Sequence, residues 1–277
     1  MTHSIVALLA QAQLPDSDTP RLDAELLLAH VLGKSRSYLL TWPERQIAEP
    51  EVARFQALLA RRRLGEPVAY LLGEQGFWTL ALQVSAHTLI PRPDTERLVE
   101  VALELGPRRP ARILDLGTGT GAIALALASE CGHWQVTGVD RMPDAVALAE
   151  VNRTRLELAN AQFLHSDWFA ALEQQTFDLI VSNPPYIAAD DPHLQQGDVR
   201  FEPDSALVSG ADGLDDIRHI VTTAPAYLQA EGWLLLEHGW QQAEAVRQLL
   251  SERGFAAVQS WQDLGGHQRV TGGCWHE

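Results

Sequence analysis

Four consecutive residues, Asn183, Pro184, Pro185 and Tyr186, directly follow the apolar run FDLIVS and are suited to holding a planar amino group. Two prolines remove two backbone donors and hold the chain extended, which leaves carbonyl groups free to face outward. The side-chain oxygen of Asn183 and the carbonyl of Pro184 can accept both N–H bonds of an –NH2 group, and Tyr186 can stack on it. Such a nitrogen is a poor nucleophile because its lone pair is delocalised. The acceptors would aim it at a methyl group and support its growing positive charge.

A glycine-rich loop, GTGTGA, opens a predicted helix after the apolar run ILDL. Glycine is needed where the backbone turns tightly and a ligand approaches it closely. The loop also satisfies the G-x-G-x-x-G/A dinucleotide pattern, so its glycines alone do not choose a cofactor. The preceding Asp115 favours S-adenosylmethionine, because a carboxylate repels a pyrophosphate but attracts the ammonium group of this phosphate-free methyl donor. The candidate cofactor contacts of the loop are Asp115, Gly117, Thr118, Gly119, Thr120 and Gly121.

Acidic residues also follow the next two predicted strands. Asp140 comes 25 residues after Asp115 and can accept hydrogen bonds from both hydroxyls of a ribose. The alternative for Asp140 is a solvated cap of the helix that follows. Asp167 can accept from the exocyclic amine of an adenine, and Trp168 can cover its ring. The alternative for Trp168 is an ordinary core aromatic.

From residue 110 onward, short apolar runs alternate with helix-like stretches. The runs are ARILDL, WQVTGVD, AQFLHSD, FDLIVSN and GWLLLEHG. This alternation predicts an α/β fold, a Rossmann-like doubly wound parallel sheet with ligands at the carboxyl ends of its strands. The runs FAAVQSW and HQRVTGG fit a final pair of edge strands. With the glycine loop upstream, we interpret residues 183–186 as a site and not merely as a turn that ends a strand.

The first 65 residues have helical periodicity instead. RLDAELLLAHVLG and EPEVARFQALLARRRLG each place apolar residues on one stripe, and Gly33 and Gly65 are typical helix stops. Residues 61–63 are all arginine, and cations are favourable at the C-terminus of a helix. They can be interpreted either as a solvated helix end or as a patch that binds a partner. GFWTLALQVS predicts a hairpin. The expected division is a helical substrate-docking domain at 1–70, a β-hairpin linker at 71–86 and a methyltransferase domain at 87–277.

Composition limits the function classes. The net charge is −15, of which residues 1–86 carry −1 and residues 87–277 carry −14. A field of this sign disfavours non-specific binding to nucleic acid. No run approaches the roughly 18 apolar residues of a membrane span, and no signal peptide is evident. Cys131 and Cys274 form no CxxC pair or zinc-ligand set. We therefore expect a cytoplasmic protein without a metal.

Together the motifs resemble those of a known family. ILDLGTGTG followed by SNPPY is similar to methyltransferases that act on amino groups with S-adenosylmethionine. EPVAYLLG at 66–73, LIPRPDTE at 89–96 and RFEPDSAL at 200–207 narrow the resemblance to the bacterial release-factor glutamine methyltransferase (PrmC/HemK) family. The resemblance covers essentially the whole chain. Small departures are Asp94, where the family often has Glu, and Arg141, where a small residue is common; the tail GGCWHE matches nothing we can place.

The resemblance implies transfer of a methyl group from S-adenosyl-L-methionine, leaving S-adenosyl-L-homocysteine. The acceptor would be the side-chain amide nitrogen of the glutamine in the Gly-Gly-Gln motif of class I peptide-chain release factors. It also implies that Gly117 to Gly121, Asp140, Trp168 and Asn183 contact the donor, and that Asn183 to Tyr186 hold the substrate glutamine.

Three other functions remain possible from the motifs alone. An adenine-N6 DNA methyltransferase or an rRNA amino-methyltransferase also acts on a planar –NH2 group, but either must grip a nucleic acid, and no basic recognition region is visible. A dinucleotide-dependent oxidoreductase would leave residues 183–186 unexplained. A non-catalytic module that binds S-adenosylmethionine or a translation factor would not need them.

Overall fold

The computed structural model describes residues 3–276, which form two compact units. The first unit runs to Glu74 and also contains Gln195–Phe201. The second unit comprises Gln75–Leu194 and the chain from Glu202 onward. The segment 195–201 therefore belongs with the helical unit. The helical domain expected from the sequence, residues 1–70, does not include this segment.

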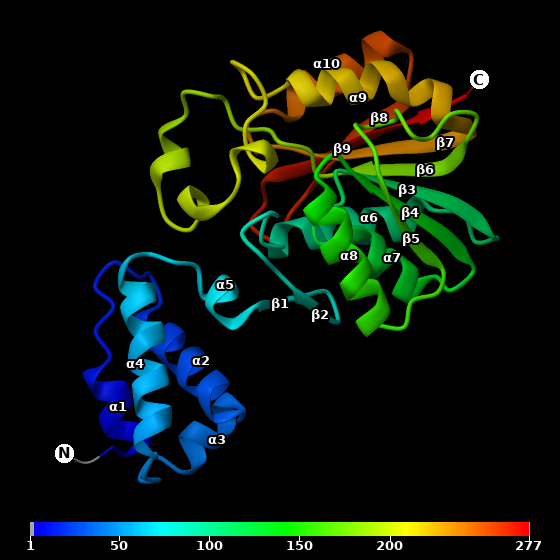
Figure 1. The fold of residues 1–277 in the computed structure, drawn as a ribbon. Coiled ribbons are helices and arrows are strands. Elements are labelled where there is room, and N and C mark those ends of the chain that lie inside the picture. Colours follow the sequence, from blue (N-terminus) through cyan, green and yellow to red (C-terminus); the bar gives the residue numbers. More distant parts are fainter. Residues whose placement is uncertain (1–2, 277) are drawn as a thin grey trace. The chain divides into compact units, whose positions relative to one another are not determined.

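The first unit is a bundle of short helices around its own apolar core (Figure 1). The side chain of Ser4 caps the first helix by accepting a hydrogen bond from the N–H of Ala7, and Gly33 ends the second with φ +60°. Leu27, Leu28 and Phe55 are fully buried at its centre. The helices are α1 (Ile5–Gln11), α2 (Pro20–Leu32), α3 (Arg36–Thr41), α4 (Glu49–Arg63) and α5 (Val68–Leu72).

One of the three arginines that end α4 has a structural role. Arg62 is largely buried and donates to Asp23 at 2.7 Å and to Asp198 at 3.0 Å. The second contact fastens the segment 195–201 to the helical unit. Arg62 is therefore neither a solvated helix end nor a free patch, because both of its partners lie inside the same unit.

The second unit begins with the hairpin that the sequence predicts. Strands β1 (Glu74–Phe77) and β2 (Leu80–Gln83) form a two-stranded sheet. Phe77 and Leu82 are buried in the core of this unit. The backbone N–H of Gln83 donates to Asn152, which lies on helix α8 (Pro143–Arg155). The hairpin therefore packs against the sheet domain.

A seven-stranded sheet has the order β5-β4-β3-β6-β7-β9-β8. The first five strands in that order are parallel, and β9 and β8 are antiparallel to their neighbours. The predicted doubly wound fold is confirmed. The strands are β3 (Ala111–Leu116), β4 (Trp134–Asp140), β5 (Ala161–His165), β6 (Phe177–Ser182), β7 (Leu228–Glu237), β8 (Ala256–Gln262) and β9 (Gln268–Trp275).

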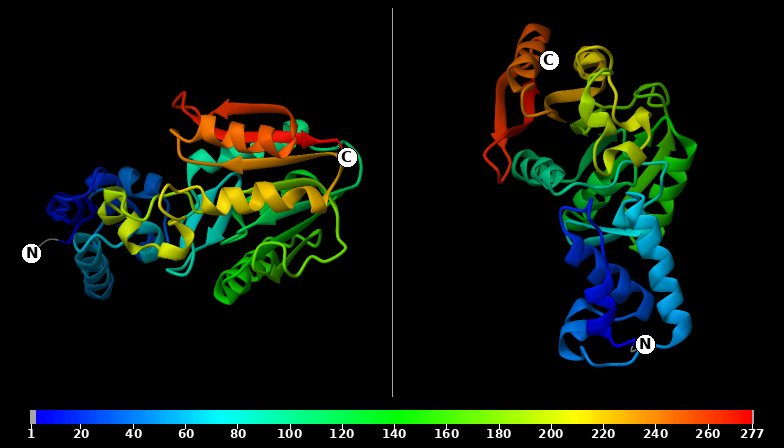
Figure 2. Two further views of the ribbon diagram at one scale, coloured as in Figure 1. Left: turned by 90° about the horizontal axis from the view of Figure 1, so that it is seen from above. Right: turned by 90° about the vertical axis from the view of Figure 1, so that its left-hand side faces the viewer.

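Helices cover both faces of the sheet (Figure 1). The helices α6 (Glu96–Leu105), α7 (Ala122–Glu130) and α8 lie on one face, and α9 (Asp215–Thr223) and α10 (Ala243–Arg253) lie on the other, seen from above in Figure 2. Alternate strand residues enter the two cores, as Ile113 faces the first group and Leu114 the second. Both faces of the parallel strands are therefore apolar, which explains their continuous hydrophobic runs.

The order of the last two strands differs from our expectation. Strand β8 is at the edge, but β9 lies inside, between β7 and β8, so the two are not both edge strands. The tail glycines explain how β9 fits. A Cβ at Gly272 would lie 2.4 Å from Leu235, and one at Gly273 would lie 2.8 Å from Phe255. The first residues of the tail GGCWHE, which matched no known motif, therefore form the end of β9 in the sheet.

Near the end of β9, residues of the tail form a small cluster with a residue of β7. Glu231, Cys274 and His276 place potential metal-ligand atoms within 4.8 Å of one another there. None of these three residues lines the pocket described below.

Short 3-10 helices shape the segments that flank the sheet. They are η1 (Pro93–Thr95), η2 (Pro192–Gln195), η3 (Val199–Phe201), η4 (Asp204–Ala206) and η5 (Ala224–Tyr227). Helix α9 ends at Thr223 and gives way to η5, the segment that contains Pro225. Among the described residues, no helix has the length and apolar character needed to cross a membrane.

Candidate active site

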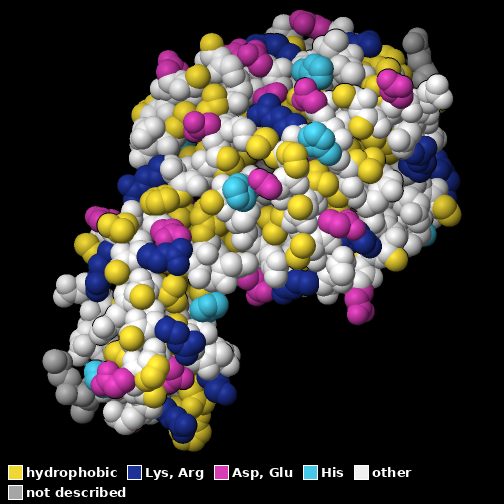
Figure 3. Space-filling model, viewed as in Figure 1, with side chains coloured by type: hydrophobic (Ala, Val, Ile, Leu, Met, Phe, Trp, Pro, Cys, Tyr) yellow, Lys and Arg dark blue, Asp and Glu magenta, His cyan; other side chains and the backbone are white. Residues whose placement is uncertain are grey.

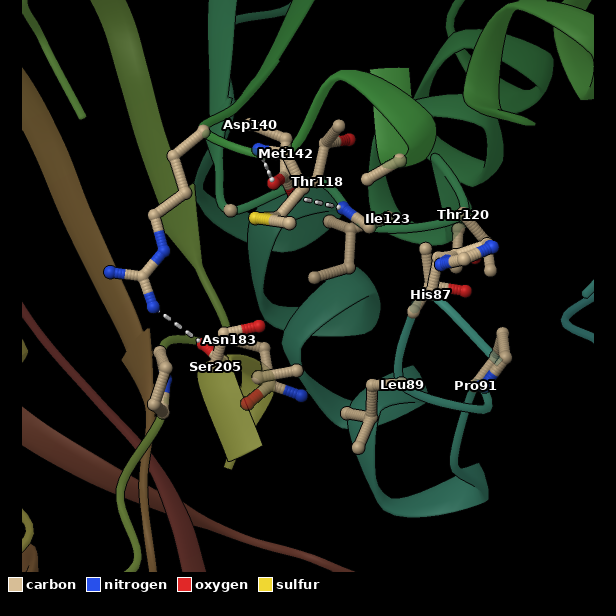
Figure 4. Close-up of a pocket in the computed structure, with 18 of the residues that line it drawn as sticks. His87, Leu89, Pro91, Thr118, Thr120, Ile123, Asp140, Met142, Asn183 and Ser205 are labelled. Atoms are coloured by element: carbon tan, nitrogen blue, oxygen red, sulfur yellow. Dashed lines mark hydrogen bonds between the residues drawn. The ribbon is translucent and has the colours of Figure 1, made fainter. Parts of the chain in front are cut away.

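A pocket lies in the second unit, at the carboxyl ends of the central parallel strands. The space between its walls, counted together with the part open to solvent, is about 900 Å³. Figure 4 shows Asp140 and Asn183, from different strands, around the same hollow. The lining residues belong to five segments, 87–95, 117–123, 140–145, 166–168 and 205–206, together with Asn183 and Pro185.

The glycine loop follows β3 and brings its backbone to the pocket. Gly117 and Gly119 have φ of +68° and +54°, which only glycine adopts readily. A Cβ at Gly119 would meet no atom within 4 Å, so this part of the backbone faces open space that a ligand can fill. Four of the candidate cofactor contacts of this loop line the pocket: Gly117, Thr118, Gly119 and Thr120.

Gly121, the third glycine, does not line the pocket. Its φ is +82°, and a Cβ there would lie 2.9 Å from Phe163 and 3.0 Å from Leu125. Gly121 is therefore required for packing the start of α7 against the sheet. Its predicted contact with a cofactor has no support from this geometry.

Asp115 lies beneath the loop and is fully buried. Its Oδ2 accepts hydrogen bonds from the Thr118 hydroxyl at 2.6 Å and from the Ala124 N–H at 3.2 Å, while Oδ1 has no partner among the described residues. Burial raises the pKa of the Asp115 carboxyl to about 7. Asp115 therefore shapes the loop from below, and the structure does not place it among the residues that line the pocket.

Asp140, at the end of β4, does line the pocket. Its Oδ2 accepts from the N–H of Gly119 and its Oδ1 from the N–H of Met142, both at 2.9 Å (Figure 4). Met142 is the residue before α8, so Asp140 binds the segment that leads into that helix; no side chain of a described residue caps the helix itself, as the alternative interpretation of Asp140 would require. Each carboxylate oxygen can accept a further hydrogen bond. Asp140 can therefore bind both the glycine loop and the segment before α8 and still accept hydrogen bonds from ligand hydroxyls.

Trp168 and Asp167 form a wall of the same pocket. Trp168 is half-buried, with a positive φ of +47°, and one edge of its ring packs against the core below α9. A Cβ on Gly117 would lie 3.6 Å from this ring, so the indole flanks the glycine loop. Trp168 is thus both a core contact and a pocket wall. Asp167 is exposed at the rim.

The tetrapeptide after β6 is only partly in the pocket. Asn183 and Pro185 line it, whereas Pro184 and Tyr186 are outside its lining. The side-chain nitrogen of Asn183 donates to the Thr95 hydroxyl at 3.1 Å, which leaves Oδ1 free to accept. Burial raises the pKa of Tyr186 above its ordinary value, so the phenol stays neutral. The tetrapeptide can therefore offer an acceptor oxygen to an –NH2 group.

The sequence reasoning missed one wall of the pocket as a site, although its motif was visible. His87, Thr88, Leu89, Pro91, Arg92 and Thr95 all line it, and five of them belong to or adjoin LIPRPDTE. Glu202, in RFEPDSAL, holds this wall by accepting from the N–H of Ile90 at 2.8 Å and from Arg92 at 2.5 Å. The two motifs are thus joined by one buried carboxylate.

Ser205 and Ala206, which belong to the same motif as Glu202, line the opposite side. Arg141 donates to the carbonyl of Ser205 at 3.0 Å (Figure 4). The unusual residue at position 141 therefore connects the segment after β4 with η4.

The sheet order, the glycine loop and the polar ends of the strands define a methyltransferase of the Rossmann-like class. Residues 95–198 match the family model described as the methyltransferase small domain, and residues 4–73 match the PrmC N-terminal domain. A solved methyltransferase from Pyrococcus furiosus has the same fold, with a TM-score of 0.55, 16% identity and coverage of 80% of this chain and 98% of that chain.

A second solved relative carries a ligand. A 16S rRNA methyltransferase from T. thermophilus, in complex with AdoMet and guanosine, aligns with a TM-score of 0.52 and 25% identity. The alignment covers 73% of this chain and 50% of that one.

Curated relatives identify the family. The release factor glutamine methyltransferase of Pseudomonas aeruginosa is 62% identical over 98% of this chain and 99% of its own length. Those of Vibrio cholerae and Escherichia coli are 58% and 54% identical, over 94% and 97% of this chain and 92% and 97% of their own lengths. The chain belongs to the family of release factor glutamine methyltransferases, which confirms the resemblance stated from the motifs.

Proposed function

We propose that this enzyme transfers the methyl group of S-adenosylmethionine to the side-chain amide nitrogen of the Gly-Gly-Gln glutamine in class I release factors. The observation that carries the proposal is Asn183, whose amide is tied at its nitrogen to Thr95 and presents its oxygen in a pocket beside the glycine loop. The names of relatives that match nearly the whole chain support the same substrate.

The pocket residues fit S-adenosylmethionine. Open space above Gly119 permits close approach to the backbone, Asp140 has lone pairs left for ribose hydroxyls, and Trp168 offers an aromatic wall. Asp167 at the rim can accept from the adenine amine. When bound, S-adenosylmethionine supplies the methyl group from its positively charged sulfonium.

The protein's own groups then orient the nucleophile. Asn183 Oδ1 and the Pro184 carbonyl accept the two N–H bonds of the glutamine amide and fix the plane of its nitrogen. As the new N–C bond forms, positive charge grows on this nitrogen, and the two oxygens stabilise it electrostatically. This bond replaces the S–CH3 bond of the donor, and one N–H proton then passes to water, which restores a neutral amide. Tyr186 stays neutral and so adds no competing negative charge beside the nitrogen.

The charge distribution favours a protein over a nucleic acid as the substrate. On the face shown in Figure 3, arginine and lysine side chains are scattered among acidic ones and form no continuous basic band. The second unit also carries most of the net negative charge of the chain. The test is to follow labelled methyl groups, which should enter a purified class I release factor and not duplex DNA at low salt.

We further propose that the helical unit docks the folded release factor. A Gly-Gly-Gln tripeptide has one distinctive side chain and two flexible glycines, so the pocket alone would bind it weakly. Contacts remote from the reacting atoms can supply the missing binding energy. Large apolar side chains are exposed on this unit: Leu40 at 60%, Trp42 at 58% and Val6 at 46%. The Val6 N–H donates to the Pro43 carbonyl, so Val6 lies next to the Trp42 segment.

Replacing Leu40 and Trp42 together by serine should therefore raise KM for an intact release factor by about tenfold, the loss expected for one apolar anchor of an interface. Activity on a short Gly-Gly-Gln peptide should not change, because the peptide lacks the folded surface of the factor that the helical unit would dock. Leu264→Ser, which removes a fully exposed leucine from the second unit, is the control and should affect activity on neither substrate. Equal KM values for wild type and the double variant on the intact factor would show that this surface does not dock it.

A further inference from the structure

A buried carboxyl group lies beside the catalytic asparagine, and the mechanism above does not use it. Glu237 ends β7, is 2% exposed, and its Oε2 has no hydrogen-bond partner among the described residues. Strand β7 runs parallel to β6, with Leu236 opposite Ser182, so Glu237 and Asn183 follow neighbouring strands at the same end of the sheet. Burying a carboxyl group costs free energy unless neighbouring groups form hydrogen bonds or ion pairs with it.

The surroundings of Glu237 form a polar chain that leads to Asn183. Asn183 Nδ2 donates to Thr95 Oγ1 at 3.1 Å, and Thr95 itself is 4% exposed. Thr95 and Asn183 lie close enough to the Glu237 carboxyl group for hydrogen bonding from their side chains to lower its pKa. A hydroxyl group can accept one hydrogen bond and donate another. Thr95, which accepts from Asn183, can therefore donate its own O–H to the Glu237 carboxylate. The direction of the chain is from amide to hydroxyl to carboxylate.

This direction determines which end of the Asn183 amide faces the substrate. An ionised carboxylate only accepts hydrogen bonds, so it draws donors toward itself. The amide nitrogen of Asn183 is then held on the Thr95 side, and Oδ1 faces the pocket. If the amide rotated by half a turn, its N–H groups would meet the N–H groups of the glutamine and repel them.

We infer that Glu237 and Thr95 are positioning residues that fix the amide orientation of Asn183 for methyl transfer. The inference rests on the proposed function, because only an –NH2 substrate needs the oxygen of Asn183. Glu237 does not line the pocket, and Thr95, which does, is bound through its hydroxyl to the amide of Asn183. They act through the asparagine, as buried partners commonly fix the geometry of a functional group.

The ionisation of Glu237 gives this arrangement a pH dependence. Burial raises the pKa of Glu237 to about 7, and the charges facing it are Arg269 on β9, which lowers the pKa, and Asp94 on η1, which raises it. Tyr186 also faces it and stays neutral. Below this pKa, a protonated Glu237 can donate, and the chain of hydrogen bonds can reverse. Turnover should therefore rise as pH increases through about 7.

The test compares single-turnover rates of the full-length enzyme on an intact release factor, at about one pH unit on each side of that pKa. Glu237→Gln should lower kcat on the alkaline side by about tenfold, the smaller end of the range for a hydrogen bond to a charged group. Its rate should lose the dependence on pH near 7. KM for the factor and the affinity for S-adenosylmethionine, measured by calorimetry, should stay close to the wild-type values.

Variants of Thr95 test the same chain without removing the carboxyl group. Thr95→Val removes the hydroxyl at similar volume and should lower kcat to a similar degree, whereas Thr95→Ser keeps the hydroxyl and should restore the rate. Asp178→Asn is the matched control: it alters another buried carboxylate, at the start of β6, which pairs with Arg109 outside the pocket. It should keep the wild-type rate and pH profile.

Two results overturn the inference. If Glu237→Gln folds, and it keeps both the rate and the pH dependence of an active wild type, Glu237 does not position Asn183. If Glu237→Gln does not fold, the threonine pair decides, and equal rates for Thr95→Val and Thr95→Ser contradict the chain of hydrogen bonds. A wild type that fails to methylate the factor overturns the proposed function, and this inference with it.

Discussion

Replacing Asn183 by alanine is expected to lower kcat for release-factor methylation by about 10²- to 10³-fold, the usual cost of losing one preorganised group that stabilises transition-state charge. The effect belongs to the chemical step because Asn183 Oδ1 gains most as the glutamine nitrogen becomes positive. Ground-state binding changes less, since the Pro184 carbonyl still accepts one N–H bond. Single-turnover kinetics with saturating methyl donor measure the loss, and calorimetry measures donor affinity.

Asn183→Asp is a sharper probe of the same role. Its carboxylate keeps an accepting oxygen, but it loses the N–H that donates to Thr95 and adds negative charge beside a cationic donor. We expect tighter or unchanged donor binding together with slow transfer, because the orientation of the acceptor is no longer fixed. If donor affinity fell as steeply as kcat in both variants, Asn183 would be part of the donor pocket and not of the transition-state machinery.

The second large effect is expected at Asp140. Hydrogen bonds to a charged group contribute about 1.5–3 kcal/mol, so Asp140→Ala should weaken binding of S-adenosylmethionine by about 10- to 100-fold. The loss has two sources: the ribose loses its acceptor, and the N–H groups of Gly119 and Met142 lose the carboxylate that orders the loop. Isothermal calorimetry on the folded variant measures it directly.

Two further variants separate these sources. Asp140→Asn retains an oxygen that can accept from one backbone N–H, so its loss should be smaller than that of the alanine variant. Asp144→Ala removes a nearby exposed carboxylate that does not line the pocket, and it should leave affinity unchanged. Unchanged donor affinity in Asp140→Ala would remove Asp140 from the cofactor site.

Local patterns in the sequence were sufficient to predict the sheet and the ends of its strands. Alternating apolar runs and helices determine a doubly wound sheet, and residues that follow parallel strands must meet at one edge. This is why Asp140, Trp168 and Asn183 line one pocket although they are far apart in the chain. The antiparallel pairing of β9 with β7 has no such signal in the local sequence. The position of β9 between β7 and β8 was therefore not predicted.

The depth of each residue could not be read from its motif. Asp115 and Gly121 share one loop with Gly119, yet Asp115 lies below it and Gly121 faces Phe163. Both support the loop without lining the pocket. Spacing along a loop does not say which side of the backbone faces a ligand, because tertiary packing decides that.

Contacts between distant segments were the least predictable part of the site. Glu202 binds the segment that carries Ile90 and Arg92, and Glu237 lies beside Asn183, although nothing in the local sequence pairs them. The motifs LIPRPDTE and RFEPDSAL are both recognisable in the sequence. Only the structure shows that Glu202 of the second motif binds residues of the first. GWLLLEHG was predicted only as a strand, so its terminal glutamate was not recognised as part of the site.

The central claim, methylation of one glutamine amide, is tested most directly by following labelled methyl groups into a release factor. Purified wild-type enzyme, labelled S-adenosylmethionine and an intact class I factor are incubated beside the same factor with its Gly-Gly-Gln glutamine replaced by alanine, and beside duplex DNA at low salt. We predict that label accumulates until the wild-type factor is fully methylated, and that the alanine factor and the DNA stay unlabelled. Equal labelling of the alanine factor, or label in adenine of the DNA, would contradict the account.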